Sequence, residues 1–345
     1  MSIELQSPES HKRRKVAFCF IAGLVSFFSL TVCLFHAIDV YSHERVPQLR
    51  PLSRVANLPH NSTLDPSHTD QRLIIVGDVH GMYNELLRLM DEVKYNKELD
   101  TIVFLGDMIT KGYDSVGIVD FAIENNAFCV RGNHEDEIMS IYASYHNLDM
   151  PKTYPPFASA SRMTAGTPVS VSMEPTEGPR VPPKNGLPNG NYDRDLPLVK
   201  QLERRHIDYL ASCPAILDLG KISKRGIEAV AVHGGLLWDE LDLEKQDVYD
   251  VIRLRSIVPP DYSSGSEIPD DGIPWFGKWN DEQMKRKKEN RFEVFYGHDA
   301  SKGLQMHRYC KGLDTRCQRG GKLSAYVVTV THAAHYHEEL IQIDC

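Results

Sequence analysis

Side chains that bind metals recur at five places in this sequence. Asp78 and His80 stand two residues apart in GDVHG, and Asp107 follows a glycine further along the chain. Carboxylate, imidazole and amide groups without thiolates suit borderline or hard divalent cations such as Zn²⁺, Mn²⁺, Co²⁺ or Fe²⁺. The pattern therefore favours a metal centre. The five stretches are residues 77–81, 106–107, 131–135, 233–235 and 297–299.

The first three stretches each follow a short apolar run that is typical of a buried strand. The runs at residues 73–76, 101–105 and 127–130 are separated by helical patterns at residues 82–93 and 115–124. This alternation predicts a β-α-β-α-β series with parallel strands. The carboxyl ends of such strands form the edge where open α/β sheets place ligands.

Two later apolar runs supply further imidazoles. Residues 228–232 lead into His233, and residues 292–296 lead into His298. Each histidine taken alone is more often a satisfied core side chain than a ligand. The repetition of one arrangement, a strand followed by a polar turn, favours the metal-binding interpretation for the whole set.

In this order, GDVHG, GD with a downstream KG, RGNHE, HGG and GH resemble the phosphoprotein phosphatase branch of the binuclear metallophosphoesterases, over most of residues 72–345. Lys111, Gly112 and GLDTRCQRGGKLSA at residues 312–325 are similar to the diadenosine-tetraphosphatase-like branch. That branch includes membrane-anchored, zinc-dependent endopolyphosphatases of fungal vacuoles. The resemblance implies an α/β fold, the four-layer αββα metallophosphoesterase sandwich with helices outside two facing sheets.

The resemblance also implies roles for the clustered side chains. Asp78 and His80 would bind one metal ion, Asp107 would bridge two ions, and three residues would complete the second site. Two such ions lower the pKa of a shared water and neutralise phosphoryl oxygens, so no phosphoenzyme is needed. His134 would be the general acid for the leaving oxygen; a structural histidine is the alternative. The ligands of the second site would be Asn133, His233 and His298.

The sequence departs from protein phosphatases at two positions, 110 and 111, which follow Asp107. Thr110 replaces the aspartate that orients the general acid, which would harm phosphoester cleavage more than anhydride cleavage, because phosphate is already a good leaving group. Lys111 replaces a phosphate-binding arginine, and its point charge selects less strictly among phosphate geometries. The remaining candidates for binding substrate phosphate are Arg255 or Arg253, Arg131 and Lys322. For each of them, the alternative is a solvated or structural charge that does not contact substrate.

The composition is that of a globular domain, with 345 residues, 41% of them hydrophobic, and a net charge of -8. This acidity argues against a protein that coats DNA. Basic residues nevertheless gather near residues 311–322 and in MKRKK at residues 284–288. An extended polyanion could use both stretches, although a solvated helix face is the usual explanation for such a run.

Residues 16–38 contain no Asp, Glu, Lys or Arg and are long enough to span a bilayer as a helix. A basic cluster at residues 11–15 precedes them, so the positive-inside rule leaves the amino terminus in the cytosol. This predicts a single-pass type II membrane protein with a lumenal catalytic domain, and the resemblance implies the vacuolar membrane. The expected parts are a cytosolic tail (1–15), an anchor (16–38), a stalk (39–71) and the catalytic domain (72–345) with a disordered insertion (151–191).

Glycosylation and cysteine usage bear on the compartment. Asn61 begins the only N-x-S/T sequon, in a stretch that this topology makes lumenal. Five cysteines follow the anchor, an odd number without a C-x-x-C pair, which argues against a disulfide framework. Cys310 and Cys317 are close enough in sequence to be bridged, and free thiols are the alternative.

Together these features predict an enzyme that hydrolyses internal phosphoanhydride bonds of inorganic polyphosphate with two divalent metal ions. The alternatives are a protein serine/threonine phosphatase and a dinucleoside-polyphosphate or RNA-cap hydrolase, whose usual substrates are cytosolic. A catalytically inactive, membrane-tethered phosphate-binding protein is a further alternative, which the complete ligand set disfavours.

Overall fold

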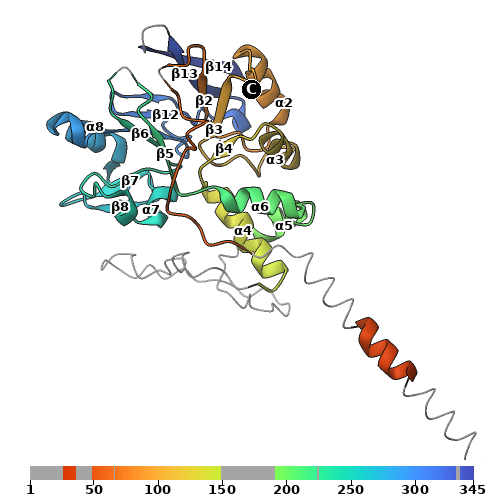
Figure 1. Ribbon diagram of the computed structural model, residues 1–345. Coiled ribbons are helices and arrows are strands. Elements are labelled where there is room, and N and C mark those ends of the chain that lie inside the picture. The colour runs from red at the N-terminus through yellow and green to blue at the C-terminus, as the bar shows by residue number, and fades with distance from the viewer. Residues whose placement is uncertain (1–25, 36–48, 66, 149–190, 224, 332–334) are drawn as a thin grey trace, which may run out of the picture. The chain divides into compact units, whose positions relative to one another are not determined.

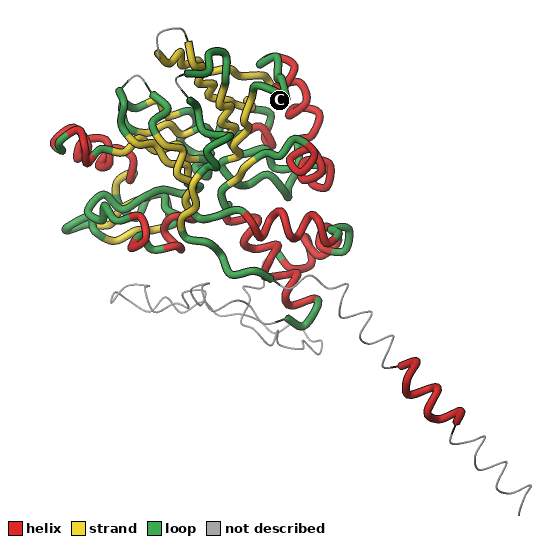
Figure 2. Tube along the Cα trace, in the orientation of Figure 1, coloured by secondary structure: helices red, strands yellow, loops and turns green. Residues whose placement is uncertain are grey.

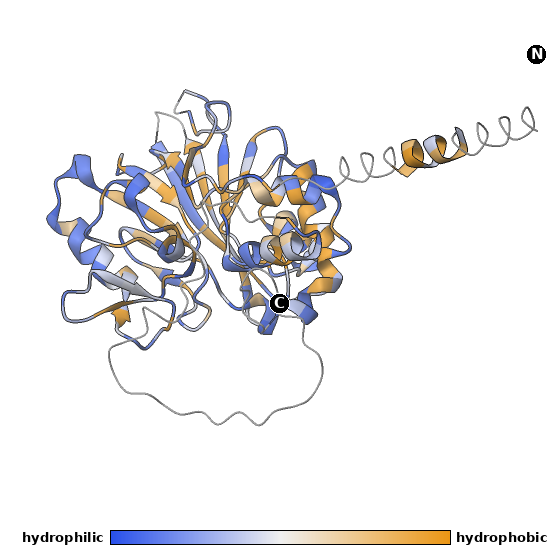
Figure 3. Cartoon of the chain, turned by 90° about the horizontal axis from the view of Figure 1, so that it is seen from below, coloured by the Kyte–Doolittle hydropathy of each residue, from blue (hydrophilic) through white to orange (hydrophobic). Residues whose placement is uncertain are grey.

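The computed structural model describes residues 26–35, 49–65, 67–148, 191–223, 225–331 and 335–345. The chain forms two compact units, Met1–Pro47 and Gln48–Cys345. In the first unit, residues 26–35 are helical (Figure 1), and Figure 3 shows this helix mostly in the colour of apolar residues. Within the described ranges, none of the helices combines the length and the apolar character that crossing a bilayer demands. The predicted anchor at residues 16–38 extends beyond the described residues and stays a prediction.

One sheet of the second unit contains the predicted β-α-β-α-β series. Its strands are β2 (Arg72–Val76), β3 (Asp100–Phe104), β4 (Phe128–Cys129), β13 (Lys322–Thr331) and β14 (His335–Asp344), and helices α2 (Tyr83–Glu92) and α3 (Ser115–Glu124) connect the first three. Strands β2, β3 and β4 pair in parallel, which confirms the series. The two carboxyl-terminal strands add antiparallel neighbours, so the order is β14-β13-β2-β3-β4.

A second sheet has six strands in the order β1-β5-β6-β10-β12-β11. Their bounds are Val55–Asn57 (β1), Ile216–Gly220 (β5), Glu228–Ala231 (β6), Phe292–Tyr296 (β10), Gln305–Met306 (β11) and Cys310–Gly312 (β12). Strand β10 runs parallel to both β6 and β12. The carboxyl ends of these three strands therefore lie at one edge of the sheet.

Strand β1 corrects the boundary between the stalk and the domain. Strand β1 lies inside residues 39–71, the segment that was predicted as a lumenal stalk, and it pairs in parallel with β5 of the folded unit. Leu52, Leu58 and Leu64 are buried in the same stretch. Their burial outweighs the proline-rich composition, which alone suggests a linker. The described part of residues 39–71, from residue 49 onward, thus belongs to the folded unit.

Three apolar cores hold the sheets and helices in four layers. Alternate residues of β2 serve two of them: Ile75 faces the other sheet, whereas Ile74 packs with the helices behind its own sheet. Val294 of β10 packs with helices on the outer face of the six-stranded sheet. This is the predicted αββα sandwich, and Figure 2 shows strands between outer helices. The outer helices, besides α2 and α3, are α4 (Asn133–Tyr145), α5 (Tyr192–Val199) and α6 (Arg204–Ser212) on one side, with α7 (Val248–Arg253) and α8 (Trp275–Lys285) on the other.

Short elements complete the described structure. A small sheet contains β7 (Ser256–Val258), β8 (Ser264–Ser266) and β9 (Ile273–Pro274), and 3-10 turns are found at Leu243–Lys245, Lys288–Asn290 and Cys317–Arg319. The predicted insertion at residues 151–191 lies outside the described residues except for Asn191, which immediately precedes α5.

Two disulfides contradict the expectation of an unbridged set of cysteines. Cys129 of β4 is bonded to Cys213, 84 residues later, and Cys317 is bonded to Cys345. Cys310 is a buried free thiol, so the predicted option of a Cys310–Cys317 bridge is wrong. The odd count misled the prediction because one buried cysteine stays reduced beside two bridges.

The Cys129–Cys213 bridge should contribute substantially to stability. Because it closes a long loop, we expect the double variant Cys129→Ala, Cys213→Ala to lose about 2–4 kcal/mol of unfolding free energy, measured by urea denaturation. Cys310→Ala removes a buried thiol without a bridge and should cost clearly less. An unfolding midpoint that is the same with and without the bridge would contradict this contribution.

Candidate metal centre

The predicted clusters meet at the carboxyl edge of the two sheets. The strand ends supply Asp78 and His80 after β2, Asp107 after β3, Asn133 and His134 after β4, His233 after β6 and His298 after β10. Parallel strands bring distant residues together here: the amide of His298 donates to both carboxylate oxygens of Asp78 at 3.1 Å. His80, Asp107 and His298 have left-handed φ values of 48°, 49° and 71°. These turns redirect the chain immediately after each strand.

Asp107 lies at the middle of the cluster. Its Oδ1 is 3.2 Å from His233 Nε2, and its Oδ2 is 3.5 Å from His80 Nε2. The two oxygens of one carboxylate thus face two separate groups of imidazoles. Ligand atoms of His80, Asp107 and His134 lie within 4.8 Å of one another, and so do those of Asp107, His233 and His298. A carboxylate shared by two such groups can bridge two cations.

Backbone carbonyls orient three of the imidazoles. His233 Nδ1 lies 2.7 Å from the Leu105 carbonyl oxygen, His298 Nε2 lies 3.0 Å from that of Arg253, and His80 Nδ1 lies 3.3 Å from that of Ile109. Each ring donates its N–H outward, which leaves the inner nitrogen as an acceptor. The inner nitrogens of His233 and His298 are 3.2 Å apart and lie 3.1 and 2.9 Å from Asn133 Oδ1. Acceptor atoms that converge in this way fit a cation.

Burial and neighbouring charges together set the protonation of these groups. It lowers the pKa of His80 to about 3 and that of His298 well below its ordinary value, so both rings are neutral near pH 7. Burial alone would raise the pKa of Asp107, but the imidazoles of His233 and His134 hold it well below its usual range. Burial, together with the carboxylates of Asp314 and Asp107, raises the pKa of Asp78 well above its usual range. Crowded buried carboxylates of this kind favour a bound cation.

His134 lies beside this cluster and contacts Thr110. Its Nε2 is 3.8 Å from Asp107 Oδ2, and its Nδ1 is 2.9 Å from the Thr110 hydroxyl. Thr110 therefore orients the ring at the position where protein phosphatases use aspartate, but it supplies no negative charge. Burial lowers the pKa of His134 to about 4, and the positive charges of Lys111 and Arg194 contribute to the lowering.

Glu135 organises the main chain around the centre. Its Oε2 accepts from the amides of Asp107 and Gly132, at 2.8 and 3.0 Å, and its Oε1 accepts from Met108 and Ile109. The side chain is completely buried. The sequence identified Glu135 only as part of RGNHE, because three of its four amide partners belong to a segment 26 to 28 residues earlier.

The candidate phosphate-binding cations separate into two groups. Lys111 is exposed, and its Nζ lies 2.9 Å from His80 Nε2, so it reaches the centre. Arg255 is half-buried and donates to the His298 carbonyl at 3.3 Å. Arg253 is nearly buried and paired with Asp136 at 2.6 Å. Of the two predicted arginines, Arg255 is therefore the better placed to meet a substrate.

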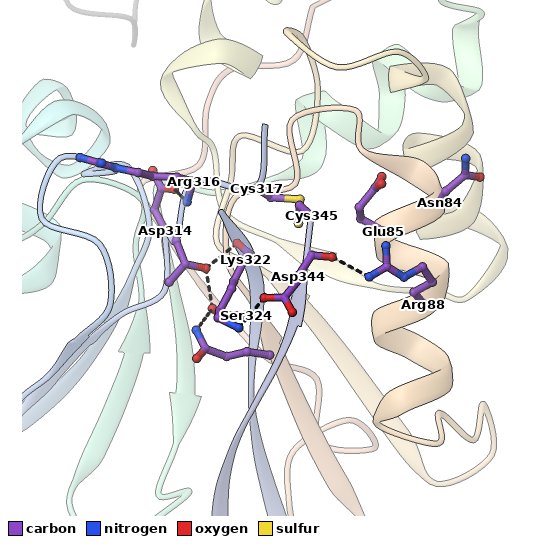
Figure 4. The surroundings of a disulfide bond; sticks show 12 residues. Asn84, Glu85, Arg88, Asp314, Arg316, Cys317, Lys322, Ser324, Asp344 and Cys345 are labelled. Carbon is purple, nitrogen blue, oxygen red and sulfur yellow. Dashed lines mark hydrogen bonds and ion pairs between the residues drawn. A yellow bond between two sulfur atoms is a disulfide. The ribbon is translucent and has the colours of Figure 1, made fainter. Parts of the chain in front are cut away.

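Of the remaining candidates, the structure contradicts Arg131, whereas Lys322 stays a prediction. The side chain of Arg131 is completely buried, which prevents contact with a substrate. Lys322 pairs with Asp344 at 2.6 Å beside the Cys317–Cys345 disulfide (Figure 4). Both side chains are largely exposed, so this pair does not decide whether Lys322 also meets a substrate. The sequence could not indicate either environment, because each depends on residues distant in the chain.

The two basic stretches do not form one track. Residues 284–288 precede the amino end of β10, whereas His298 follows its carboxyl end, so they lie at opposite edges of the sheet. Lys311 is buried against Glu293 at 2.7 Å. Arg316 and Arg319 are exposed in the loop after β12, at the edge of the metal centre. A polyanion at that centre can meet only this second stretch.

Comparisons with known proteins agree with this site. Residues 71–338 match the family model described as calcineurin-like phosphoesterase. The chain is 28% identical to the zinc-dependent endopolyphosphatase of Saccharomyces cerevisiae over 97% of its own length and 99% of the yeast protein. It is 23% identical to the symmetrical bis(5'-nucleosyl)-tetraphosphatase of Nitrosospira multiformis, over 72% and 90% of the two chains. The crystal structure of a candidate diadenosine tetraphosphatase has a TM-score of 0.57 at 24% identity, covering 85% of this chain and 98% of that one, which shows a shared fold.

Proposed function

Because the chain belongs to the calcineurin-like phosphoesterase family and is a metal-dependent phosphatase, we propose that its substrate is inorganic polyphosphate, whose internal phosphoanhydride bonds it hydrolyses. The observation that carries this choice is the Thr110 hydroxyl on His134. A neutral partner stabilises a protonated imidazole less than a carboxylate does, so a smaller fraction of His134 carries a proton to donate. This scarcity matters little for a phosphate leaving group, which departs readily without a proton, but it matters for an alkoxide. The full-length similarity to the yeast endopolyphosphatase supports the same substrate.

The residues at the centre divide the work. Asp78, His80 and Asp107 would hold one divalent ion, and Asp107 with the second set of ligands would hold the other. When bound, the two metal ions would lower the pKa of a water molecule and neutralise phosphoryl oxygens. Lys111 and Arg255 orient the phosphoryl group from the rim of the site, and His134 Nε2 gives a proton to the leaving oxygen. The second set is Asn133, His233 and His298.

We also propose that the folded unit lies in an oxidising lumen, tethered to the vacuolar membrane in type II orientation. Two disulfides support this, because such bonds rarely persist in the cytosol. Asn61 is exposed in a turn, where a glycan can be attached. Protease digestion of sealed vesicles tests the orientation: loss of the carboxyl-terminal unit without detergent would contradict it.

The substrate is tested by direct comparison. The protein should be incubated with Zn²⁺, Mn²⁺, Co²⁺ or Fe²⁺ and with long-chain polyphosphate, diadenosine tetraphosphate or a phosphopeptide. Chain fragments of intermediate length would support internal cleavage of polyphosphate. A clear preference for diadenosine tetraphosphate would instead favour the activity named for the Nitrosospira relative. Preference for the phosphopeptide would make the protein a phosphoprotein phosphatase.

Thr110→Asp should change the preference for leaving groups. Thr110 has φ of 71°, a conformation that aspartate adopts more readily than threonine, so the backbone should tolerate the change. The new carboxylate would favour the protonated imidazole of His134. We expect kcat/KM for an alkyl phosphomonoester to rise about 10-fold relative to polyphosphate. Thr110→Ser keeps a hydroxyl and is the control; equal changes for both substrates would contradict the assignment.

A further inference from the structure

A cavity of about 310 Å³ adjoins the metal centre. The segment between β3 and α3 forms one wall with Thr110 and Lys111, and α5 and the turn after it form another with Arg194, Leu198 and Gln201. Thr110 also hydrogen-bonds His134 at 2.9 Å. The cavity therefore opens from the His134 side of the centre. A leaving group protonated by His134 departs on this side.

Arg194 is held in position by a buried carboxylate. Its Nε and Nη2 donate to Asp195 Oδ1 and Oδ2 at 2.8 and 2.6 Å. The Asp195 side chain is 6% exposed, whereas that of Arg194 is 47% exposed. Among the described residues, Arg194 Nη1 has no hydrogen-bond partner. The guanidinium is thus fixed on one edge and retains donors on the other, the arrangement that suits bidentate binding of phosphate.

The carboxylates that line the cavity have partners in the protein. Asp114 caps α3 and accepts from the Gly117 amide at 2.7 Å. Asp195 binds Arg194, as described above. Glu137 is not among the lining residues, but it lies 4.0 Å from Arg194 Nη2, at the limit of an ion pair. Among the residues that line the cavity, Lys111 and Arg194 are the exposed cations. They lie on the two sides of the cavity, where a linear polyanion can meet both.

We propose that this cavity binds the phosphoryl groups on the leaving side of the scissile bond, and that Arg194 is the residue that selects long chains. This inference rests on the proposed polyphosphatase function. Binding of several phosphates beyond the reacting one on the leaving side would direct hydrolysis to internal bonds. Arg194 would act by holding the chain and would take no part in the proton transfer itself.

The test compares a substrate that has phosphates beyond the scissile bond with one that has none. Arg194→Gln should raise KM for long-chain polyphosphate about 10-fold, the loss of one charge-assisted hydrogen bond, while kcat stays within about twofold. For p-nitrophenyl phosphate, whose leaving group carries no phosphate, kcat/KM should change by no more than about twofold, the effect of the Arg194 charge on the pKa of His134. Arg194→Lys should restore part of the affinity for polyphosphate.

A matched variant separates binding from folding. Arg194→Gln leaves Asp195 buried without its partner, so the double variant Arg194→Gln, Asp195→Asn should show the same KM increase with normal thermal unfolding. An equal loss with both substrates, or no loss with polyphosphate, would overturn the inference while leaving the proposed function intact. Loss confined to diadenosine tetraphosphate would assign the cavity to a nucleoside and also overturn it. A wild-type protein that cleaves p-nitrophenyl phosphate but not polyphosphate would overturn both.

Discussion

Asp107→Asn should abolish hydrolysis of phosphoanhydrides, with a loss of at least about 10³-fold in kcat/KM, equivalent to about 4 kcal/mol of transition-state stabilisation. Asp107 is the only one of the predicted ligands whose two oxygens face both groups of imidazoles. An amide has one weak oxygen donor and an NH₂ group that repels a cation. Bridging is therefore lost even though the shape of the side chain is kept.

The fold should survive this substitution. The Oδ1 of Asp107 accepts from the His134 amide at 3.0 Å, and an asparagine oxygen can keep that hydrogen bond. We expect normal circular dichroism together with a loss of bound metal, measured by elemental analysis after purification. Asp299→Asn is the matched control: Asp299 is also buried at this edge, but it binds Ser301 and lies outside the predicted ligand set. Full activity and full metal content in Asp107→Asn would refute the bridging role.

The sequence predicted the strand ends well because each metal-binding group is local to a motif. In GDVHG, an apolar strand, a glycine and two ligands occupy neighbouring positions, so the element and its side chains are specified together. Parallel connectivity then requires the motifs to share an edge. This is why all six predicted ligands converge in the structure, although the role of each stays a prediction.

What the sequence could not predict depends on distant partners. The bond between Cys129 and Cys213 joins β4 to the residue after α6, and no spacing rule selects this pair among five cysteines. The sequence around Arg194 contains no motif that marks it as functional. Only the fold places α5 and Lys111 on the walls of one cavity and so brings Arg194 to the site. Arg131 is the opposite case: it belongs to a motif at a strand end, yet its side chain is fully buried and cannot reach a substrate.

Gly132→Ala should have the second large effect, by steric conflict at the metal centre. Gly132 has φ of -85° and ψ of 167°, which alanine adopts without strain, so any loss must come from the added methyl group. That group would overlap the Asp107 amide and Oδ1, and it would lie 2.5 Å from Glu135 Oε2. Both the bridging carboxylate and the acceptor that orders its main chain would have to move.

We expect Gly132→Ala to lose about 3 kcal/mol of unfolding free energy and most of its bound metal, because overpacking of a buried site is felt in full. Gly277→Ala is the matched control: no atom lies within 4 Å of its added methyl group in α8, and a helical alanine should stabilise by about 0.5–1 kcal/mol. Gly132→Ala should thus unfold at a lower temperature and lose metal, whereas Gly277→Ala should unfold at the same or a higher temperature and keep its metal. If Gly132→Ala kept full metal and activity, the close packing of Gly132 against Asp107 could not be what positions the bridging carboxylate.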